Sequence, residues 1–164
     1  MCKMDHANHN DGPIWANIPA RNPNSTRQWN GMRDYGAEPF VVDIEEATLQ
    51  NRNFRTALWT GNHLQLTLMS IGTGDDIGLE MHPDVDQFIR VEEGEGVALM
   101  GNSRDNLSYR QNVSDDDAII IPAGTCHNII NTGGEPLKLY SIYAPPEHPH
   151  GTVHMTKEEA VHSQ

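Results

Sequence analysis

Residue types that bind metals recur at fixed distances from glycine and proline in two stretches of the chain, and this spacing constrains the fold most. The first stretch covers 74–94 and the second covers 122–131. The residues that carry the pattern are, in order, Gly74, Glu80, His82, Gln87, Gly94, Pro122, Gly124, His127 and Asn131. Alternate side chains of a strand point to one face, so Glu80 and His82 project together if their segment is extended. In a closed antiparallel barrel, the two stretches can converge on one interior point.

Short apolar runs separated by turn-forming residues fill the middle of the chain. The sequence predicts strands at 64–71, 87–91, 96–100, 107–111, 118–121, 128–131 and 137–143. A hairpin turn is predicted over 101–106, which is rich in turn formers, and brief helical segments are predicted at 44–49 and 157–161. Many short strands with Gly and Pro turns are typical of an all-β sandwich or barrel.

The spacings of the two stretches resemble the two motifs of the cupin superfamily, and the resemblance covers about residues 64 to 144. It implies an all-β, double-stranded β-helix: a jelly-roll-like antiparallel barrel. We expect an extended N-terminal arm at 1–35, the cupin barrel at 36–146 and a C-terminal tail at 147–164. The usual first motif has two histidines and a glutamate, and the second has another histidine. Here Glu80 stands at the first histidine position and Gln87 at the glutamate position, while Asp116 replaces the leading glycine of the second motif.

The resemblance implies a metal cup formed by Glu80, His82, Gln87 and His127. Two neutral imidazoles and one carboxylate suit one divalent transition metal such as Zn, Fe, Mn, Co or Ni, and a Gln carbonyl is a weaker oxygen ligand for a fourth position. Asp86 is the alternative to Gln87, which counting back six residues from Gly94 favours. A structural role is the alternative for each residue, and Gln87 in particular could only hydrogen-bond a ligand or substrate.

Three functions fit such a cup. The first is a metalloenzyme acting on a small oxygenated molecule, dioxygenase- or lyase-like, with the metal as Lewis acid and Glu80 as ligand or catalytic base. The second is a sugar-phosphate isomerase, since the ligand types are similar to the zinc set of type I phosphomannose isomerases in permuted order. A phosphosugar needs basic partners, and Arg90 has the strand parity opposite to Gln87. The third is a non-catalytic module that binds a small molecule.

Composition narrows the partners. The 164 residues suffice for one ordinary domain, and a net charge of −12 disfavours nucleic acid and anionic membranes as partners. The sequence contains no run of 18 apolar residues and starts without a secretory signal pattern. The two cysteines, Cys2 and Cys126, do not suggest a disulfide framework, so we expect a cytoplasmic protein. Cys126 directly precedes His127, so in a strand it should face away from the metal.

Two terminal regions carry further expectations. Cupin resemblance implies a homodimer, and Trp15 and Trp29 of the arm offer apolar surface to a barrel edge or a second subunit. The C-terminal region contains His148, His150, His154 and His162. For these histidines solvated surface is the prediction, and the alternatives are contact with the cup or chelation of adventitious metal.

Overall fold

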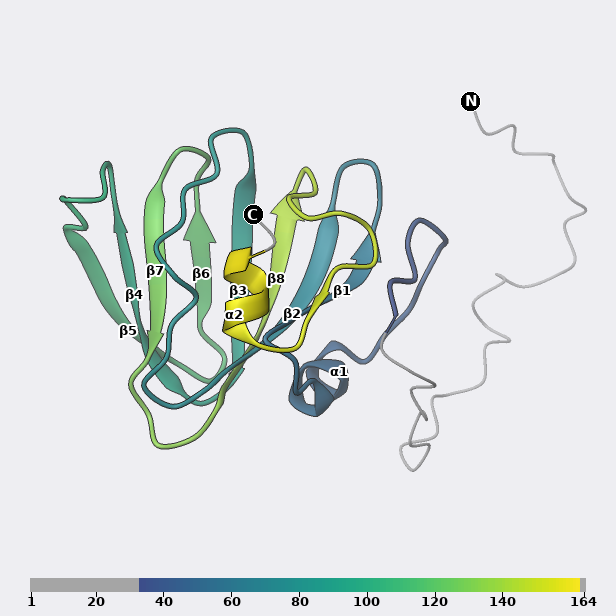
Figure 1. The fold of residues 1–164 in the computed structure, drawn as a ribbon, viewed down its shortest axis with the longest axis horizontal. Helices are drawn as coiled ribbons and strands as arrows, with labels where there is room; N and C mark the ends of the chain where they lie inside the picture. Colours follow the sequence, from purple (N-terminus) through teal and green to yellow (C-terminus); the bar gives the residue numbers. More distant parts are fainter. Residues whose placement is uncertain (1–32, 163–164) are drawn as a thin grey trace, which may run out of the picture.

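The computed structural model describes residues 33–162, which form nine short strands and two short helices (Figure 1). The expectations for Trp15 and Trp29 therefore lie outside the described residues. In chain order the elements are α1 (Ile44–Gln50), β1 (Arg55–Thr60), β2 (Gln65–Ile71), β3 (Asp86–Glu93), β4 (Glu95–Gly101), β5 (Tyr109–Ser114), β6 (Ala118–Ile121), β7 (Cys126–Asn131), β8 (Leu137–Ala144), β9 (Val153–His154) and α2 (Lys157–His162). Within 33–162, neither helix is long and apolar enough to cross a membrane.

The strands form two antiparallel sheets rather than one closed barrel. The larger sheet has the strand order β6-β3-β8-β2-β1-β9, and the smaller has the order β5-β4-β7. Residues 75–82, between β2 and β3 in the chain, run beside β7 of the smaller sheet and pair with it through two isolated bridges. The all-β, jelly-roll-like fold is confirmed, and the convergence expected of a barrel interior is achieved between two facing sheets.

The space between the sheets is apolar at one end and polar at the other. Alternate residues of β8 face inward, and they change from Leu137 and Leu139 to Ser141 and Tyr143 along the strand. The apolar end contains Ile89, Ile129 and other buried aliphatic side chains. Each such side chain contributes about 1.5–3 kcal/mol to folding when fully buried. Packing at the apolar end therefore stabilises the two sheets that position the polar side chains at the other end.

Helix α1 covers the outer face of the larger sheet. Asp43 caps it by accepting a hydrogen bond from the backbone N–H of Glu46 at 3.1 Å. Ala47 of the helix is buried against Leu58 and Leu68, whose side chains point outward from β1 and β2. Helix α1 thus covers part of the outer face, and the two sheets face each other on the inner side.

Most predicted elements are present, and two strands were missed. The helical segments predicted at 44–49 and 157–161 correspond to α1 and α2. Strand β1 is not predicted from the sequence, and neither is β9, which pairs with β1 at the edge of the larger sheet. The strand predicted at 107–111 lies further along the chain, at 109–114. Residues 151–162, expected as polar tail, therefore contribute both a strand and a helix.

Candidate metal centre

An irregular extended segment, residues 75–82, delivers Glu80 and His82 to the space between the sheets. Asp76 pairs with Ile130, but Glu80 pairs with His127, so four steps along the segment oppose three along β7. One extra residue in a strand is a β-bulge, and Gly78 lies within it at a φ of +89°. The bulge sets the register in which Glu80 lies directly across from His127, and opposed residues share a face.

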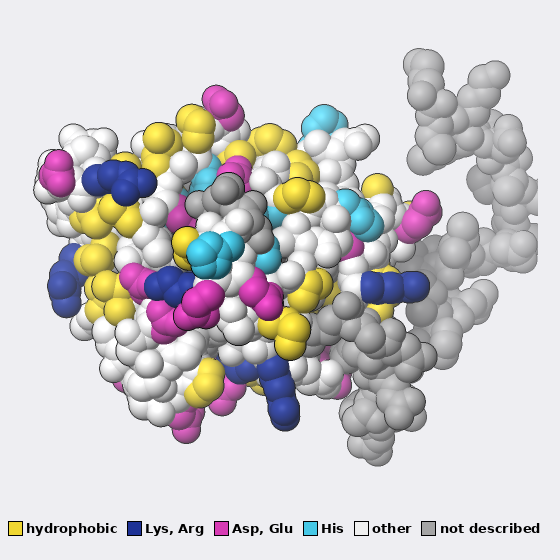
Figure 2. All heavy atoms as spheres, viewed as in Figure 1, with side chains coloured by type: hydrophobic (Ala, Val, Ile, Leu, Met, Phe, Trp, Pro, Cys, Tyr) yellow, Lys and Arg dark blue, Asp and Glu magenta, His cyan; other side chains and the backbone are white. Residues whose placement is uncertain are grey.

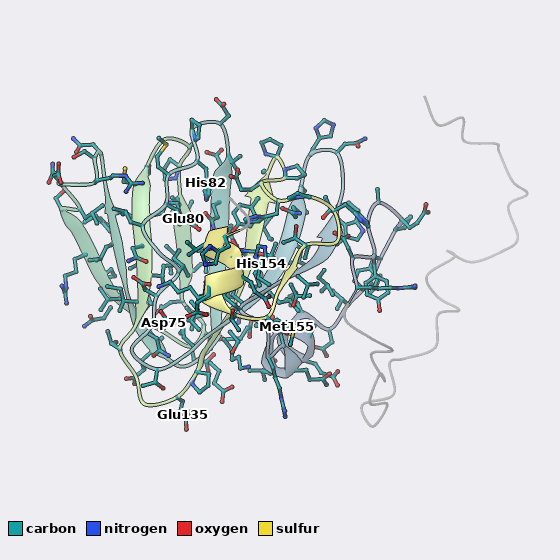
Figure 3. The ribbon with its side chains drawn as sticks, viewed as in Figure 1. Asp75, Glu80, His82, Glu135, His154 and Met155 are labelled. Carbon is teal, nitrogen blue, oxygen red and sulfur yellow. The ribbon has the colours of Figure 1, made fainter. Side chains whose placement is uncertain are left out.

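The side chains of Glu80, His82 and His127 meet at one point. One ligand atom from each lies within 4.8 Å of the other two. The Oε2 atom of Glu80 is 3.4 Å from Nε2 of His82 and 3.8 Å from Nε2 of His127. The His127 side chain is 1% exposed, so the group is screened from bulk water. Figure 3 shows Glu80 and His82 together in the middle of the molecule.

The two imidazoles are each held by the nitrogen that does not face the centre. Nδ1 of His127 lies 2.9 Å from the carbonyl oxygen of Thr125, and Nδ1 of His82 lies 3.1 Å from Oε1 of Glu147. Both Nε2 atoms are buried and have no hydrogen-bond partner among the described residues. A ring nitrogen fixed in this way leaves the other nitrogen's lone pair free, which is the usual arrangement of metal-binding histidines.

Gln87, like the two histidines, has one polar atom held by a protein contact and the other left without one within residues 33–162, whereas Asp86 lies at the surface. Gln87 is 3% exposed, and its Nε2 donates to Oγ of Ser141 at 2.8 Å. Its Oε1 is buried without a hydrogen-bond partner in the part of the chain that the structure describes. Asp86 is exposed and accepts a hydrogen bond from the N–H of Ala123 at 2.8 Å. The alternation of β3 therefore points Gln87 inward and gives Asp86 a turn-stabilising role.

The segment that follows β8 covers the polar end of the interior, and Gln65 anchors it. Oε1 of Gln65 accepts from the N–H groups of Glu147 and His148, and its Nε2 donates to the carbonyl of His148 at 2.8 Å. This places the His148 ring 5.2 Å from that of Tyr143, which lies 5.8 Å from His82. The expectation of a solvated surface is therefore wrong for His148.

The remaining C-terminal histidines divide in the same way. His154 lies 3.3 Å from the buried guanidinium of Arg55, so it too is not simply solvated. His150 has a 56% exposed side chain and pairs with Asp34, and His162 is exposed. Figure 2 shows histidine and acidic side chains gathered over the middle of this face, around the C-terminal segment.

Arg55 is the site residue that sequence reasoning missed most plainly. It is 2% exposed, and its Nη2 lies 3.6 Å from Oε1 of Glu80. By contrast, Arg90 pairs with Asp116 and Glu92 at a half-exposed position, as its strand parity suggested. The available signal for Arg55 was its parity with Ala57 in a run of strand formers, but that strand was not predicted.

The local electrostatics favour an ionised Glu80 and shift the pKa values of the two imidazoles in opposite directions. Burial opposes the ionisation of Glu80, but the neighbouring His82 and the charge of Arg55 outweigh it and lower its pKa. Burial lowers the pKa of His127. Burial also opposes protonation of His82, but the carboxylates of Glu80 and Glu147 outweigh it and raise its pKa. Burial and the charge of Arg55 lower the pKa of His148 to about 3.

A cavity of about 550 Å³ lies beside this cluster, between the β4–β5 hairpin and β6. Met100 lines it and pairs across the sheet with His127, so the two side chains share the inner face. The other lining side chains are mostly apolar and include Tyr109 and Ile120. Cys126, adjacent to His127 in β7, is buried with a free thiol and points to the opposite face. It takes no part in the cluster.

Comparison with known proteins matches this geometry to a family. The family model described as "Cupin domain" matches residues 67–143. The chain is 65% identical over 130 residues to the uncharacterized protein YrkC of Bacillus subtilis (strain 168), covering 79% of this chain and 70% of that protein. An uncharacterized protein of Acanthamoeba polyphaga mimivirus is 41% identical over 122 residues, covering 74% of each.

A solved structure agrees with both matches. The crystal structure of BH2720 from Bacillus halodurans is 65% identical, with a TM-score of 0.79 over 79% of this chain and 98% of that chain. The chain therefore belongs to the cupin superfamily.

Proposed function

We propose that this cupin binds one divalent transition metal through Glu80, His82, Gln87 and His127 and uses it in an enzymatic reaction on a small oxygenated organic molecule. The proposal rests on how three side chains use their two polar atoms. In His82, His127 and Gln87, one polar atom has a protein contact within 3.1 Å, and the other is buried with no hydrogen-bond partner among the described residues. Three buried orphan acceptors beside an ionised carboxylate suit a cation.

The donor set narrows the metal. Two imidazole nitrogens and a carboxylate oxygen are ligands for Zn, Fe, Mn, Co and Ni, and a Gln carbonyl adds a hard oxygen ligand. Replacing a usual imidazole by Glu80 lowers the positive charge of the loaded cup by one unit. The harder set shifts preference towards Mn or Fe relative to metals that favour soft ligands. When bound, such an ion would supply Lewis acidity towards a substrate hydroxyl or carbonyl oxygen.

The protein's own groups have separate tasks in this proposal. The lowered pKa of Glu80 favours the ligand role over the role of general base, because an ionised carboxylate of low basicity takes protons poorly. His148 is neutral near pH 7, so its ring offers the substrate an uncharged hydrogen-bonding group. Tyr143, between the rings of His82 and His148, forms an aromatic wall that keeps both imidazoles in place.

Metal content is the direct test. Protein purified without a nickel resin should contain about one equivalent of metal by elemental analysis, and the double variant His82→Ala/His127→Ala should contain none. The matched control is His150→Ala/His162→Ala, which removes two exposed histidines and should keep the metal. Full metal occupancy in the His82/His127 variant would show that the ion binds elsewhere.

Turnover separates the enzyme from the alternative of a non-catalytic module. A binding module would return its ligand unchanged after prolonged incubation with metal-loaded protein, whereas an enzyme releases a product detectable by mass spectrometry. A sugar-phosphate isomerase gains one basic partner in Arg55, but a phosphate group generally calls on several cationic or N–H donors. We therefore keep the first function as the proposal.

The exposed apolar side chains and the free thiol bear on the oligomeric state and the cellular compartment of the protein. We infer a homodimer, supported by large apolar side chains exposed near sheet edges, with Tyr109 at 56% and Ile120 at 67% exposure. A monomer in sedimentation at micromolar concentration would contradict it. The free, buried thiol of Cys126 supports a reducing compartment such as the cytoplasm. We propose a small molecule as the main partner.

A further inference from the structure

Arg55 is a buried cation beside the proposed metal ligands, in the same sheet as Gln87 and 3.6 Å from Glu80. It lies at the start of β1, and its side chain is 2% exposed. Its Nη1 faces Nδ1 of His154 at 3.3 Å, and its Nε is buried with no hydrogen-bond partner among residues 33–162. Glu80 is the carboxylate paired with it, at 3.6 Å, beyond hydrogen-bonding distance. The guanidinium therefore has unused donor capacity directed into the protein interior.

The charges around Arg55 do not balance once a metal is bound. A guanidinium stays charged at all ordinary pH values, and a buried charge requires a partner. In the described part of the chain, two carboxylates form ion pairs within the cluster: Glu80 with Arg55, and Glu147 with His82. Together these two carboxylates oppose one guanidinium and a divalent ion, which leaves an excess of one positive charge. With Glu80 shared with the metal, no other carboxylate among residues 33–162 forms an ion pair with Arg55.

Neutral polar groups lie near Arg55 at the same polar end of the interior. Burial, and then the charge of Arg55, lowers the pKa of both His148 and His154, so neither adds charge near neutral pH. Nε2 of His148 and Oγ1 of Thr67 are buried without hydrogen-bond partners in the described part of the chain. Thr67 is paired with Ser141 on β8, the residue that holds Gln87, so this hydroxyl belongs to the same polar end. These atoms can complete the hydrogen bonds of a small bound anion.

From this arrangement we propose that the metal-loaded cup binds a small carboxylate, with Arg55 as its anion-binding residue. The inference rests on the proposed metal site and narrows its substrate to a short hydroxy or keto acid. The carboxylate of such a molecule pairs with Arg55, and its hydroxyl or carbonyl oxygen faces the metal ligands. A single excess charge matches a monoanion, whereas a phosphate monoester brings nearly two negative charges. Arg55 is the one Arg or Lys that the described contacts place beside Glu80.

The test compares two molecules of nearly equal shape. Glycolate and glycolamide differ in the charge of one end, and their binding to metal-loaded full-length protein is measured by calorimetry, with inorganic phosphate as a third probe. Glycolate should bind at least about tenfold more tightly than glycolamide, the ratio expected for one charged hydrogen bond. Equal affinity, or tighter binding of phosphate than of glycolate, overturns the inference.

Variants assign the preference to Arg55. Arg55→Gln should abolish the preference for glycolate while leaving metal affinity equal or higher, because a cation near the metal is removed. Arg55→Lys should retain part of the preference, and Arg90→Gln, at the surface pair with Asp116, should retain all of it. A glycolate preference unchanged in Arg55→Gln overturns the assignment. Because the glycolate–glycolamide comparison needs only the parent protein, an unfolded variant leaves the test intact.

Failure of the proposed metal site and failure of the carboxylate inference give different experimental results. If the parent takes up no metal, the proposed function and the carboxylate inference both fail. If it takes up one equivalent of metal but treats glycolate and glycolamide alike, only the carboxylate inference fails. Metal uptake is measured first, by elemental analysis of the same samples.

Discussion

Glu147 should tune metal affinity although it does not face the metal. Its Oε1 lies 3.1 Å from Nδ1 of His82, and its side chain is 32% exposed. Losing such a partner to a metal-binding histidine typically costs 10- to 100-fold in affinity. Because Glu147 is partly hydrated, the effect should fall near the lower end, so Glu147→Ala should weaken binding about tenfold, or about 1.4 kcal/mol.

The conservative variant separates hydrogen bonding from charge. Glu147→Gln keeps an oxygen that can accept from Nδ1 of His82, so its affinity should stay within about threefold of the parent. The assay is competition for Zn²⁺ against a chromophoric chelator at fixed pH, with Glu158→Ala, at an exposed position of α2, as control. Parent-like affinity in Glu147→Ala would refute the positioning role. Equal weakening in both Glu147 variants would show that charge, and not the hydrogen bond, carries it.

Substitutions at three further positions probe the proposed ligand Glu80, the segment that covers the polar end, and the bulge. Glu80→Ala should weaken metal binding, whereas Glu80→His should keep or tighten it while changing reactivity; unchanged affinity in Glu80→Ala would exclude Glu80 as a ligand. His148 has a folded-state pKa of about 3 against 6.5 usually, so its contribution to stability is present above pH 6.5 and is lost as the pH falls towards 3. When the pH falls from 7.5 to 5, the free energy of unfolding measured with urea should therefore fall by about 2 kcal/mol more in the parent than in His148→Gln. The control His162→Gln should behave as the parent. Equal losses of unfolding free energy in the parent and His148→Gln would contradict the buried, neutral state of His148. Gly78→Ala should lower the free energy of unfolding by about 1–2 kcal/mol, because an alanine is strained at a φ of +89°. Crowding is not the cause, since an added Cβ has open space both at Gly78 and at Gly72, so the control Gly72→Ala should be nearly neutral in thermal unfolding. Similar melting of the two variants would argue against a strained bulge.

The fold and the clustering of Glu80, His82 and His127 could be predicted because both depend on local spacing. The alternation of β3 selects Gln87 over Asp86, and glycine and proline mark the turns around His127. The bulge at Gly78 could not be predicted, because a register shift depends on the partner strand. Without it, strand parity still placed Glu80 and His82 on one face, which explains why the residue set was found although the segment is not a regular strand.

The missed residues lie where tertiary structure overrides local signals. Arg55 is a charged residue in a short strand, and only the surrounding site explains its burial. His148 follows a Pro-rich turn in a polar segment, and its position depends on three hydrogen bonds between the Gln65 side chain and the backbone of residues 147–148. Such long-range contacts, more than 80 residues apart along the chain, leave no periodic trace in the sequence.

Anomalous diffraction from metal-loaded crystals tests the central claim most directly. The account predicts one strong peak between Nε2 of His82, Nε2 of His127, a carboxylate oxygen of Glu80 and Oε1 of Gln87, with ligand distances of about 2.0 to 2.3 Å. A peak at the exposed His150 or His162, or a cup in which the rings of His82 and His127 turn away from each other with metal present in solution, would contradict it.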